Sequence, residues 1–334
     1  MPSMKKNSLI VLTLLLFAVS TLAVDATLAD ALQNTTRKGA MAKICLHVVD
    51  SEGRPVPGAR LWGGMQTGDG FNDFSPIEGL SDTNGDFVVH GKCTHRIRCR
   101  IRKNGYYQSD FLTSFPERSA NPPVIDGKWQ PFGGTNTVVL KAIRNPNKCH
   151  VFPDSLRNCR IPDWNKWIGL DLECGEWMYP YGRGRHADVL LKFMSARKGL
   201  CDYRYVMDIS FTNNLYAGAY LLKADKSSKL TTAYFADSNE TYRASFSYVK
   251  EQTPGLPRHW DFLDGDSYLV FRTRTRIDSR GNLIGAHYGK ILGQWLSETE
   301  FMILSDGCFN PVENDVNIED GSCLRDVLRN LGRE

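Results

Sequence analysis

The sequence predicts a mostly β protein: a β-sandwich followed by a second antiparallel β-sandwich or barrel domain with a short C-terminal helix. Apolar side chains recur at every second position over short segments in both halves of the chain, the spacing that lines one face of a strand. Turn sequences rich in Gly, Asn and Asp separate these segments. Helical spacing is clear only near the end, where one side of a short helix would carry Leu324, Val327, Leu328 and Leu331.

The first residues have the pattern of a secretory signal peptide. Lys5 and Lys6 precede an apolar run over residues 9–19, and Thr21-Leu22-Ala23 supplies small residues for cleavage. The run is shorter than the roughly 20 apolar residues that a bilayer crossing needs, so a cleaved signal is favoured over an uncleaved N-terminal anchor. We therefore expect an exported protein, periplasmic or extracellular, that does not span the membrane after cleavage.

Composition restricts the possible partners. The chain of 334 residues has 41 Lys and Arg against 37 Asp and Glu. Two of those lysines belong to the signal region, so the remainder is close to neutral and has no global basic field for nucleic acid. With 23% charged and 11% aromatic residues, the chain has the composition of a folded protein.

The 9 cysteines all lie after the signal region, as in proteins of oxidising compartments. Local spacing suggests three disulfides, although spacing alone does not fix connectivity: Cys149 with Cys159, Cys174 with Cys201, and Cys308 with Cys323. Cys93 and Cys99 are predicted on one strand, too far apart to bond each other. At most one of them can pair with Cys45, which leaves an odd thiol.

Residues 43–141 give the clearest strand pattern. A strand over residues 43–49 leads into "DSEGRPVPGARL", a turn followed by a proline-rich edge segment. "SDTNGDFVV" then provides a tight Asn-Gly turn into a second strand. A third strand over residues 93–102 leaves through "RIRKNGYY".

This order of segments resembles the carboxypeptidase regulatory-like family, which has a transthyretin-type fold. The resemblance implies a sandwich of about a hundred residues and a non-catalytic module that accompanies other domains. One departure is the Gly- and Asp-rich stretch over residues 63–79, which we expect to be a loop.

The second half begins after a proline-rich connector. Short strands recur from Trp164 onward, and a hairpin is expected from the Leu269–Ile277 strand through the turn at residues 278–282. This half resembles an uncharacterised domain of exported bacterial proteins through "GLDLECGEWMYPYGRGRHADV", "RIDSRGNLIGAHYGKILG" and "FNPVENDVNIE". The expected organisation is a signal peptide (1–23), a linker (24–42), the first sandwich (43–141), a connector (142–163) and the second β domain (164–334).

A cluster of aromatic and arginine residues follows the connector and is the candidate ligand site. Flat rings can stack on sugar faces, and guanidinium groups can bind hydroxyls or carboxylates. The alternative is that the rings fill the interface between the two domains. The residues are Trp164, Trp167, Trp177, Tyr179, Tyr181, Arg183 and Arg185.

The same segment carries Asp171, Glu173 and Glu176. Paired carboxylates beside aromatic residues are what a glycosidase needs, although acidic residues this close together more often form a solvated turn. The sequence has no H-E-x-x-H, G-x-S-x-G, P-loop or G-x-G-x-x-G motif. No catalytic residue and no cofactor is therefore predicted.

Three further patterns have a functional and a structural interpretation. His186 and Asp188 could bind a metal from one strand face, and residues 315–321 could bind calcium, but a surface pair and a capping turn explain them as well. Alternation places Arg96, Arg98, Arg100 and Arg102 in one row, suited either to an anionic polymer or to a solvated sheet face. No metal site is predicted.

Taken together, these patterns favour an exported, non-catalytic binding or scaffold protein of the cell envelope or secretome. Its expected partner is a glycan or an envelope protein. The alternative is a carbohydrate-active hydrolase that uses Asp171, Glu173 or Glu176.

The signal peptide is directly testable. If it is removed, mass spectrometry of the exported protein will find an N-terminus at or near Val24. Intact Met1 on a membrane-bound form would contradict export by cleavage.

Overall fold

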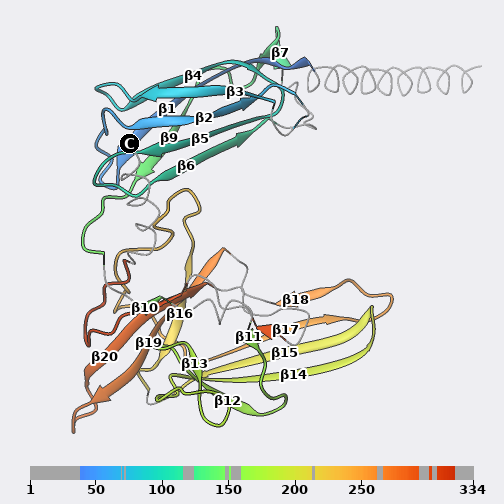
Figure 1. The fold of residues 1–334 in the computed structure, drawn as a ribbon, viewed down its shortest axis with the longest axis vertical. Coiled ribbons are helices and arrows are strands. Elements are labelled where there is room, and N and C mark those ends of the chain that lie inside the picture. Colours follow the sequence, from blue (N-terminus) through green and yellow to red (C-terminus); the bar gives the residue numbers. More distant parts are fainter. Residues whose placement is uncertain are drawn as a thin grey trace, which may run out of the picture. The chain divides into compact units, whose positions relative to one another are not determined.

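The protein is described from a computed structural model, which defines residues 38–68, 70, 73–115, 124–146, 150–151, 159–212, 215–261, 266–292, 301–302 and 307–319. The elements of this part of the chain are all β-strands, which confirms the predicted fold class. The chain divides into an N-terminal unit, Met1–Ile143, and a C-terminal unit, Arg144–Glu334 (Figure 1). The predicted helix at residues 324–331 lies outside the described residues.

The N-terminal unit is a sandwich of two sheets. In one sheet the strand order is β4-β1-β8-β7, with β9 also paired to β1. The other has the order β3-β2-β5-β6. The strands of the first sheet are β1 (Ala40–Asp50), β4 (Asp86–Cys93), β7 (Val124–Ile125), β8 (Lys128–Trp129) and β9 (Gly134–Leu140); those of the second are β2 (Arg60–Gln66), β3 (Phe74–Leu80), β5 (Arg96–Arg102) and β6 (Ser109–Ser114).

Sequence alternation explains the core of this unit. Ile44, Leu46 and Val48 of β1 are buried together with Ile97 and Ile101 of β5. Both sheets thus contribute one apolar face to a shared core, as expected for a sandwich.

The Asn-Gly turn before β4 forms as predicted. The Asp82 carboxylate accepts hydrogen bonds from the backbone amides of Asn84 and Asp86, at 2.9 and 2.8 Å. Gly85 has φ 80°, and a Cβ there would lie 2.4 Å from the Val48 carbonyl oxygen. The acidic residues of this segment therefore close a turn.

Two sequence-based expectations for this unit are wrong. The stretch 63–79 is mostly strand, because β2 and β3 include both of its ends. Its glycines permit close strand packing: a Cβ on Gly63 would lie 1.9 Å from the Arg98 carbonyl oxygen. Cys93 and Cys99 lie on β4 and β5, not on one strand, since the chain turns at residues 94–95.

The C-terminal unit contains three open sheets, so the described residues form no closed barrel. The strand orders are β13-β12-β14-β15-β17-β18, β10-β22-β20-β19-β16 and β11-β21. The six-stranded sheet comprises β12 (Trp167–Asp171), β13 (Glu176–Trp177), β14 (Val189–Gly199), β15 (Asp202–Phe211), β17 (Ser245–Gln252) and β18 (His259–Asp261). The five-stranded sheet comprises β10 (His150–Val151), β16 (Gly218–Lys223), β19 (Ser267–Ile277), β20 (Leu283–Leu292) and β22 (Cys308–Phe309). The two-stranded sheet comprises β11 (Cys159–Arg160) and β21 (Phe301–Met302).

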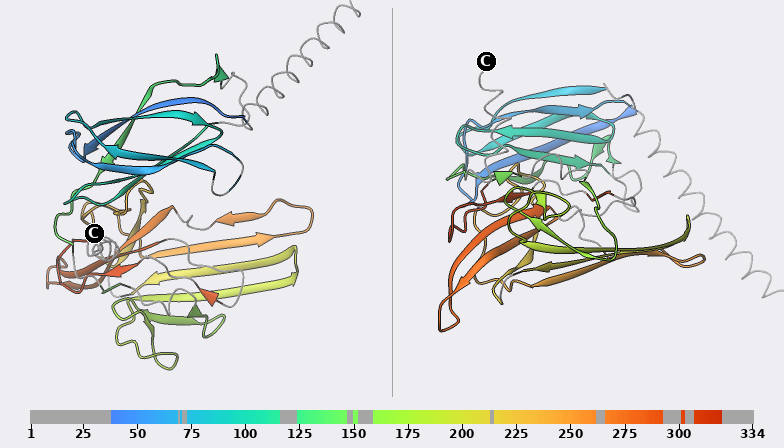
Figure 2. Two further views of the ribbon diagram at one scale, coloured as in Figure 1. Left: turned by 45° about the horizontal axis from the view of Figure 1, so that its top comes forward. Right: turned by 60° about the horizontal axis from the view of Figure 1, so that its bottom comes forward.

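The two large sheets of this unit share a core. Leu191, Phe193 and Ile209 of the six-stranded sheet pack in one cluster with Phe271 and Phe309 of the five-stranded sheet. In the right-hand view of Figure 2 the yellow-green strands β14 and β15 and the orange strands β19 and β20 lie in different layers. The other face of the five-stranded sheet covers a smaller cluster around Tyr220, Val270 and Tyr288. Within the described residues no helix has the length and apolarity of a membrane span.

The division after Ile143 has a direct consequence for folding. The last backbone hydrogen bond of the N-terminal unit runs from the Ile143 amide to Gly105, at 2.7 Å, and the core of this unit lies entirely between residues 40 and 140. A chain truncated after Ile143 should therefore fold alone, with a β-rich circular dichroism spectrum and a cooperative thermal transition. An unfolded fragment, obtained under conditions where the full chain is folded, would contradict this division.

Candidate functional site

A β-bulge directs Arg274 into the C-terminal unit. Thr273 pairs with His287 and Arg276 pairs with Gly285, so β19 uses three residues where β20 uses two. Arg274 occupies the extra position with φ 48°, a region that non-glycine residues seldom adopt. Because of this break in alternation, Arg274 and the preceding Thr273 both hydrogen bond Asp188.

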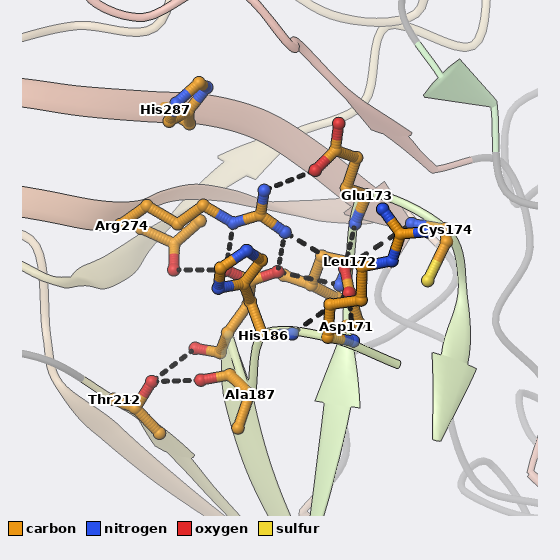
Figure 3. A network of polar contacts seen from close by, with 12 residues as sticks. Asp171, Leu172, Glu173, Cys174, His186, Ala187, Thr212, Arg274 and His287 are labelled. Atoms are coloured by element: carbon orange, nitrogen blue, oxygen red, sulfur yellow. Dashed lines mark hydrogen bonds and ion pairs between the residues drawn. The ribbon is translucent and has the colours of Figure 1, made fainter. Parts of the chain in front are cut away.

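The Arg274 guanidinium binds three carboxylates. It holds Asp188 through two parallel bonds, Nε to Oδ1 at 2.9 Å and Nη2 to Oδ2 at 3.0 Å. Nη2 also donates to Asp171 Oδ1 at 3.0 Å, and Nη1 donates to Glu173. Figure 3 shows the side chain of Arg274 pointing toward Asp171 and Glu173. On its other side, the guanidinium lies 4.7 Å from the centre of the Phe309 ring.

The two aspartates are almost fully buried, and every carboxylate oxygen has at least two donors. Asp171 Oδ1 also accepts from the Glu173 amide, and Oδ2 accepts from the amides of Arg185 and His186, at 3.0, 2.9 and 3.1 Å. Asp188 Oδ1 also accepts from the Thr273 hydroxyl at 3.1 Å, and Oδ2 from the Leu172 amide at 2.9 Å. The acceptor capacity of both groups is filled.

These contacts favour the charged forms of Asp171 and Arg274. Burial alone would raise the pKa of Asp171, but the amides of Arg185, His186 and Glu173 and the Arg274 charge hold that pKa below its usual value. Burial would lower the pKa of Arg274, but hydrogen bonds and charges from Asp188 and Glu173 raise it further above its usual value. Permanently charged, fully bonded groups are suited to holding structure, and they are poorly suited to transferring protons.

The cluster also bears on the metal interpretation of His186 and Asp188. The Asp188 carboxylate is directed at Arg274 and Leu172, whereas His186 is exposed on the adjoining loop. Among the described residues no group of three or more His, Cys, Asp or Glu side chains is arranged to hold a metal ion.

The predicted aromatic residues divide into two groups. Trp177 is buried in the core of the C-terminal unit and Trp164 packs against that core. Trp167, Tyr179 and Tyr181 are 49, 88 and 39% exposed. Arg183 and Arg185 of the same segment are also exposed. Packing within the unit accounts for Trp177 and for part of the Trp164 side chain, so only part of the predicted set is available to a ligand.

Residues 177–185, here called the aromatic loop, form a closed turn. The Tyr181 amide donates to Met178 at 3.0 Å and the Gly184 amide donates to Trp177 at 2.9 Å. A Cβ on Gly182 would lie 2.4 Å from the Trp177 carbonyl oxygen, so the turn requires glycine there. The loop is thereby fixed on the edge strand β13.

A polar contact joins the aromatic loop to the segment before β12. The Tyr181 hydroxyl donates to Asp163 at 2.7 Å, and Lys166 pairs with the same carboxylate oxygen at 2.8 Å. Trp167 directly follows Lys166 in the sequence. The Tyr181 hydroxyl is therefore anchored to the segment that leads into β12.

The structure does not bring Cys174 and Cys201 together, and both are free thiols. Leu170 of β12 pairs with Val189 at the start of β14, but Cys201 lies in the turn after Gly199. From Val189 to Gly199 the strand β14 advances by ten residues, which is about 34 Å. This distance is far beyond the reach of a disulfide. Cys149 and Cys323 lie outside the described residues, so the other two pairings stay predictions.

The acidic segment near the end of the chain is engaged by backbone groups. Asp315 accepts a hydrogen bond from the Asn317 amide at 3.0 Å, and Asn317 accepts one from the Glu319 amide at 2.9 Å. Both oxygens of Glu319 accept amides, those of Arg144 and Asn145, at 2.9 and 2.8 Å. The side-chain oxygens of Asp315 and Asn317 therefore close local turns, and those of Glu319 fasten the chain to the connector. Residues 320–321 lie outside the described part.

Sequence reasoning missed the role of Arg274 and Phe309. Alternation along β19 assigns Arg272, Arg274 and Arg276 to one side, but the bulge separates them. Arg272 lies over the Tyr242 ring at 4.0 Å, whereas Arg276 forms an exposed pair with Glu313. The one signal in the sequence was the run of arginines at alternate positions 272, 274 and 276 of a strand that is otherwise largely apolar.

Replacing Arg274 by Met tests whether the cluster is structural. The variant leaves two buried carboxylates without their cation, which should lower the free energy of unfolding by about 3–5 kcal/mol at pH 7. The matched control is Arg276→Met, two residues along the same strand, where the pair with Glu313 is exposed. A much smaller loss is expected there, and urea unfolding measures both.

The pH dependence of the free energy of unfolding should differ in sign between the wild type and Arg274→Met. In the wild type the pKa of Asp171 is below its usual value of 3.8, so its contribution is present above about pH 4 and is lost as the pH falls through the folded-state pKa. Without Arg274 the pKa of Asp171 loses one of the contributions that lower it, while burial still raises it. Acidification from pH 7 to 5 should therefore recover part of the lost stability. Equal losses for Arg274→Met and Arg276→Met would contradict this role.

Comparisons with known proteins leave the family unassigned. No protein-family model matches the chain, and no curated protein sequence matches it. Among solved structures it is similar to 3-chlorocatechol 1,2-dioxygenase from Rhodococcus opacus 1CP, with 15% identity and a TM-score of 0.25, over 32% of this chain and 62% of that one. The chain therefore matches less than two thirds of the length of that dioxygenase.

Two other solved structures are matched over more of their length. A DUF3823 family protein from Parabacteroides merdae ATCC 43184 has 9% identity and a TM-score of 0.21, covering 81% of this chain and 98% of that one. The shaft pilin SpaA from Lactobacillus rhamnosus GG has 8% identity and a TM-score of 0.21, covering 55% and 91%. The all-β architecture is as predicted, and the two family resemblances seen in the sequence stay predictions.

Proposed function

We propose that the protein is an exported, non-catalytic binding protein whose aromatic loop holds a glycan. The observation that carries the proposal is a closed loop, fixed to a sheet edge, that exposes the rings of Tyr179 and Tyr181. Loops on rigid sheets are where binding residues concentrate. The predicted signal peptide supports action outside the cytoplasm.

The exposed rings have the properties of a stacking surface. Tyr179 is 88% exposed, so its ring contributes little to the core and is available to a ligand. Tyr181 is held in place by its bond to Asp163, so little conformational entropy is lost when a sugar packs on it. Arg183 and Arg185 supply hydrogen-bond donors on the same loop.

The state of the carboxylates supports a non-catalytic role. A glycosidase needs one protonated and one ionised carboxyl group facing each other across the scissile bond. Asp171 has a lowered pKa and no unfilled acceptor position, and Glu173 binds Arg274. Of the three candidates only Glu176 is exposed, so the required pair is not assembled around the Arg274 cluster.

The test compares glycan binding by the wild type and by Tyr179→Ala/Tyr181→Ala. A glycan array on the purified protein identifies the ligand, and calorimetry measures the affinity. Loss of both rings should weaken binding about tenfold or more, corresponding to about 1.4 kcal/mol per tenfold, with an unchanged melting temperature. Tyr181→Phe keeps the ring and should retain most of the affinity.

Phe235→Ala is the matched control, since Phe235 is an exposed aromatic residue of the same unit, 50% exposed, outside the aromatic loop. The proposal is wrong if the array shows no glycan binding, or if the double variant binds as Phe235→Ala does. Sugar release that Glu176→Gln abolishes would instead support the hydrolase.

A further inference from the structure

The N-terminal unit carries a straight row of arginines on the outer face of its second sheet. Arg96, Arg98, Arg100 and Arg102 alternate along β5 with Ile97, Cys99 and Ile101, which are buried in the core. The predicted alternation is thus confirmed. Alternate residues of a strand are about 6.8 Å apart, so the row spans about 20 Å. We call these residues the arginine row.

The neighbours of the row are mostly uncharged. Strand β5 lies between β2 and β6 in the sheet (Figure 1). Arg98 stands opposite Gly64 on β2 and Leu112 on β6, and Arg96 stands opposite Ser114. Only at Arg100 is a carboxylate directly opposite, that of Asp110. The surroundings therefore leave most of the positive charge of the row uncompensated.

The arginines differ in their partners. Arg100 lies 3.9 Å from Asp110, in a weak pair. Arg102 packs over the Trp62 ring at 5.4 Å and donates to Gln108 at 3.3 Å. Among the described residues, neither Arg96 nor Arg98 has a carboxylate partner, and both are exposed. Another acidic group of this unit, Glu78 on β3, pairs with Arg60 at 3.0 Å.

The face that carries the row is uncovered in the described part of the chain. Leu112 on β6 is 59% exposed, and Phe74 and Leu80 on β3 are 41 and 63% exposed. A sheet face that combines exposed apolar groups with unpaired guanidiniums offers packing and charge together. Such a surface is typical of a binding face.

We infer that the arginine row binds a linear anionic polysaccharide, one that carries a carboxylate or sulfate on its repeating unit. Guanidinium groups present paired donors that match such oxyanions. Four of them in line fit an extended polymer better than a compact anion. The exposed apolar groups beside the row provide surface for sugar rings. Single-stranded nucleic acid is less suited, because the described rings of this face do not alternate with the arginines as a base-stacking platform requires. Trp62 lies under Arg102, and Phe74 lies on β3, two strands from the row.

The arginine row belongs to the N-terminal unit and the aromatic loop to the C-terminal unit, so different residues test the two proposals and each can fail without the other. The test uses the purified full chain with alginate as the carboxylated probe, heparin as the sulfated probe and dextran as the neutral one. Arg96→Gln/Arg98→Gln removes the unpaired charges and keeps hydrogen-bonding side chains. Binding to at least one anionic probe should weaken about tenfold or more, and wild-type binding should fall with added salt.

The matched control is Lys43→Gln/Lys128→Gln, which removes the same charge from exposed residues of the other sheet of this unit. It should bind the anionic probe as the wild type does, and melting temperatures verify folding of all variants. The inference is overturned if the wild type binds neither alginate nor heparin, or if the two double variants weaken binding equally. Tighter binding to an oligo-dT strand than to either polysaccharide would also overturn it.

Discussion

Burial of the Arg274 charge is the constraint on which the C-terminal unit depends. Asp171 ends β12 and Asp188 precedes β14, both in the six-stranded sheet, whereas Arg274 comes from β19 of the other sheet. Desolvating these groups is costly, and only a complete set of donors and acceptors offsets that cost. The amides of Leu172, Glu173, Arg185 and His186 complete the set. The backbone around the cluster is fixed as a consequence.

The same constraint links the fold to the candidate binding surface. Asp171 receives the amides of Arg185 and His186, and these residues are the point at which the aromatic loop returns to the sheet. Trp177 holds the other end of the loop through its burial in the core. A loop fixed at both ends can expose Tyr179 and Tyr181 without losing its shape, which is the condition for a preorganised binding site.

The N-terminal unit is organised by apolar burial, and the arginines of β5 stay on its outer face. Cys93 and Cys99 lie in its core as buried thiols, and burial raises the pKa of Cys99 to about 12, so that side chain packs as a neutral, apolar group. Strand alternation then directs every charged residue of β5 to the outer face. The two units thus expose different chemistry, one of aromatic rings and one of guanidiniums.

The sequence by itself determined the mostly β class, the Asn-Gly turn at Gly85 and the alternation of β5, because side-chain period and turn chemistry are local properties. Tertiary structure decided which rings are exposed: Trp177 and Tyr179 are two residues apart, but one enters the core and the other points to solvent. It also decided the partners of Arg274, because a bulge inserts one residue and moves the side chain to the other face of the strand. The separation of Cys174 from Cys201 follows from the length of the β14–β15 hairpin. Pairing register, bulges and hairpin length depend on contacts between distant segments, and local spacing carries no information about them.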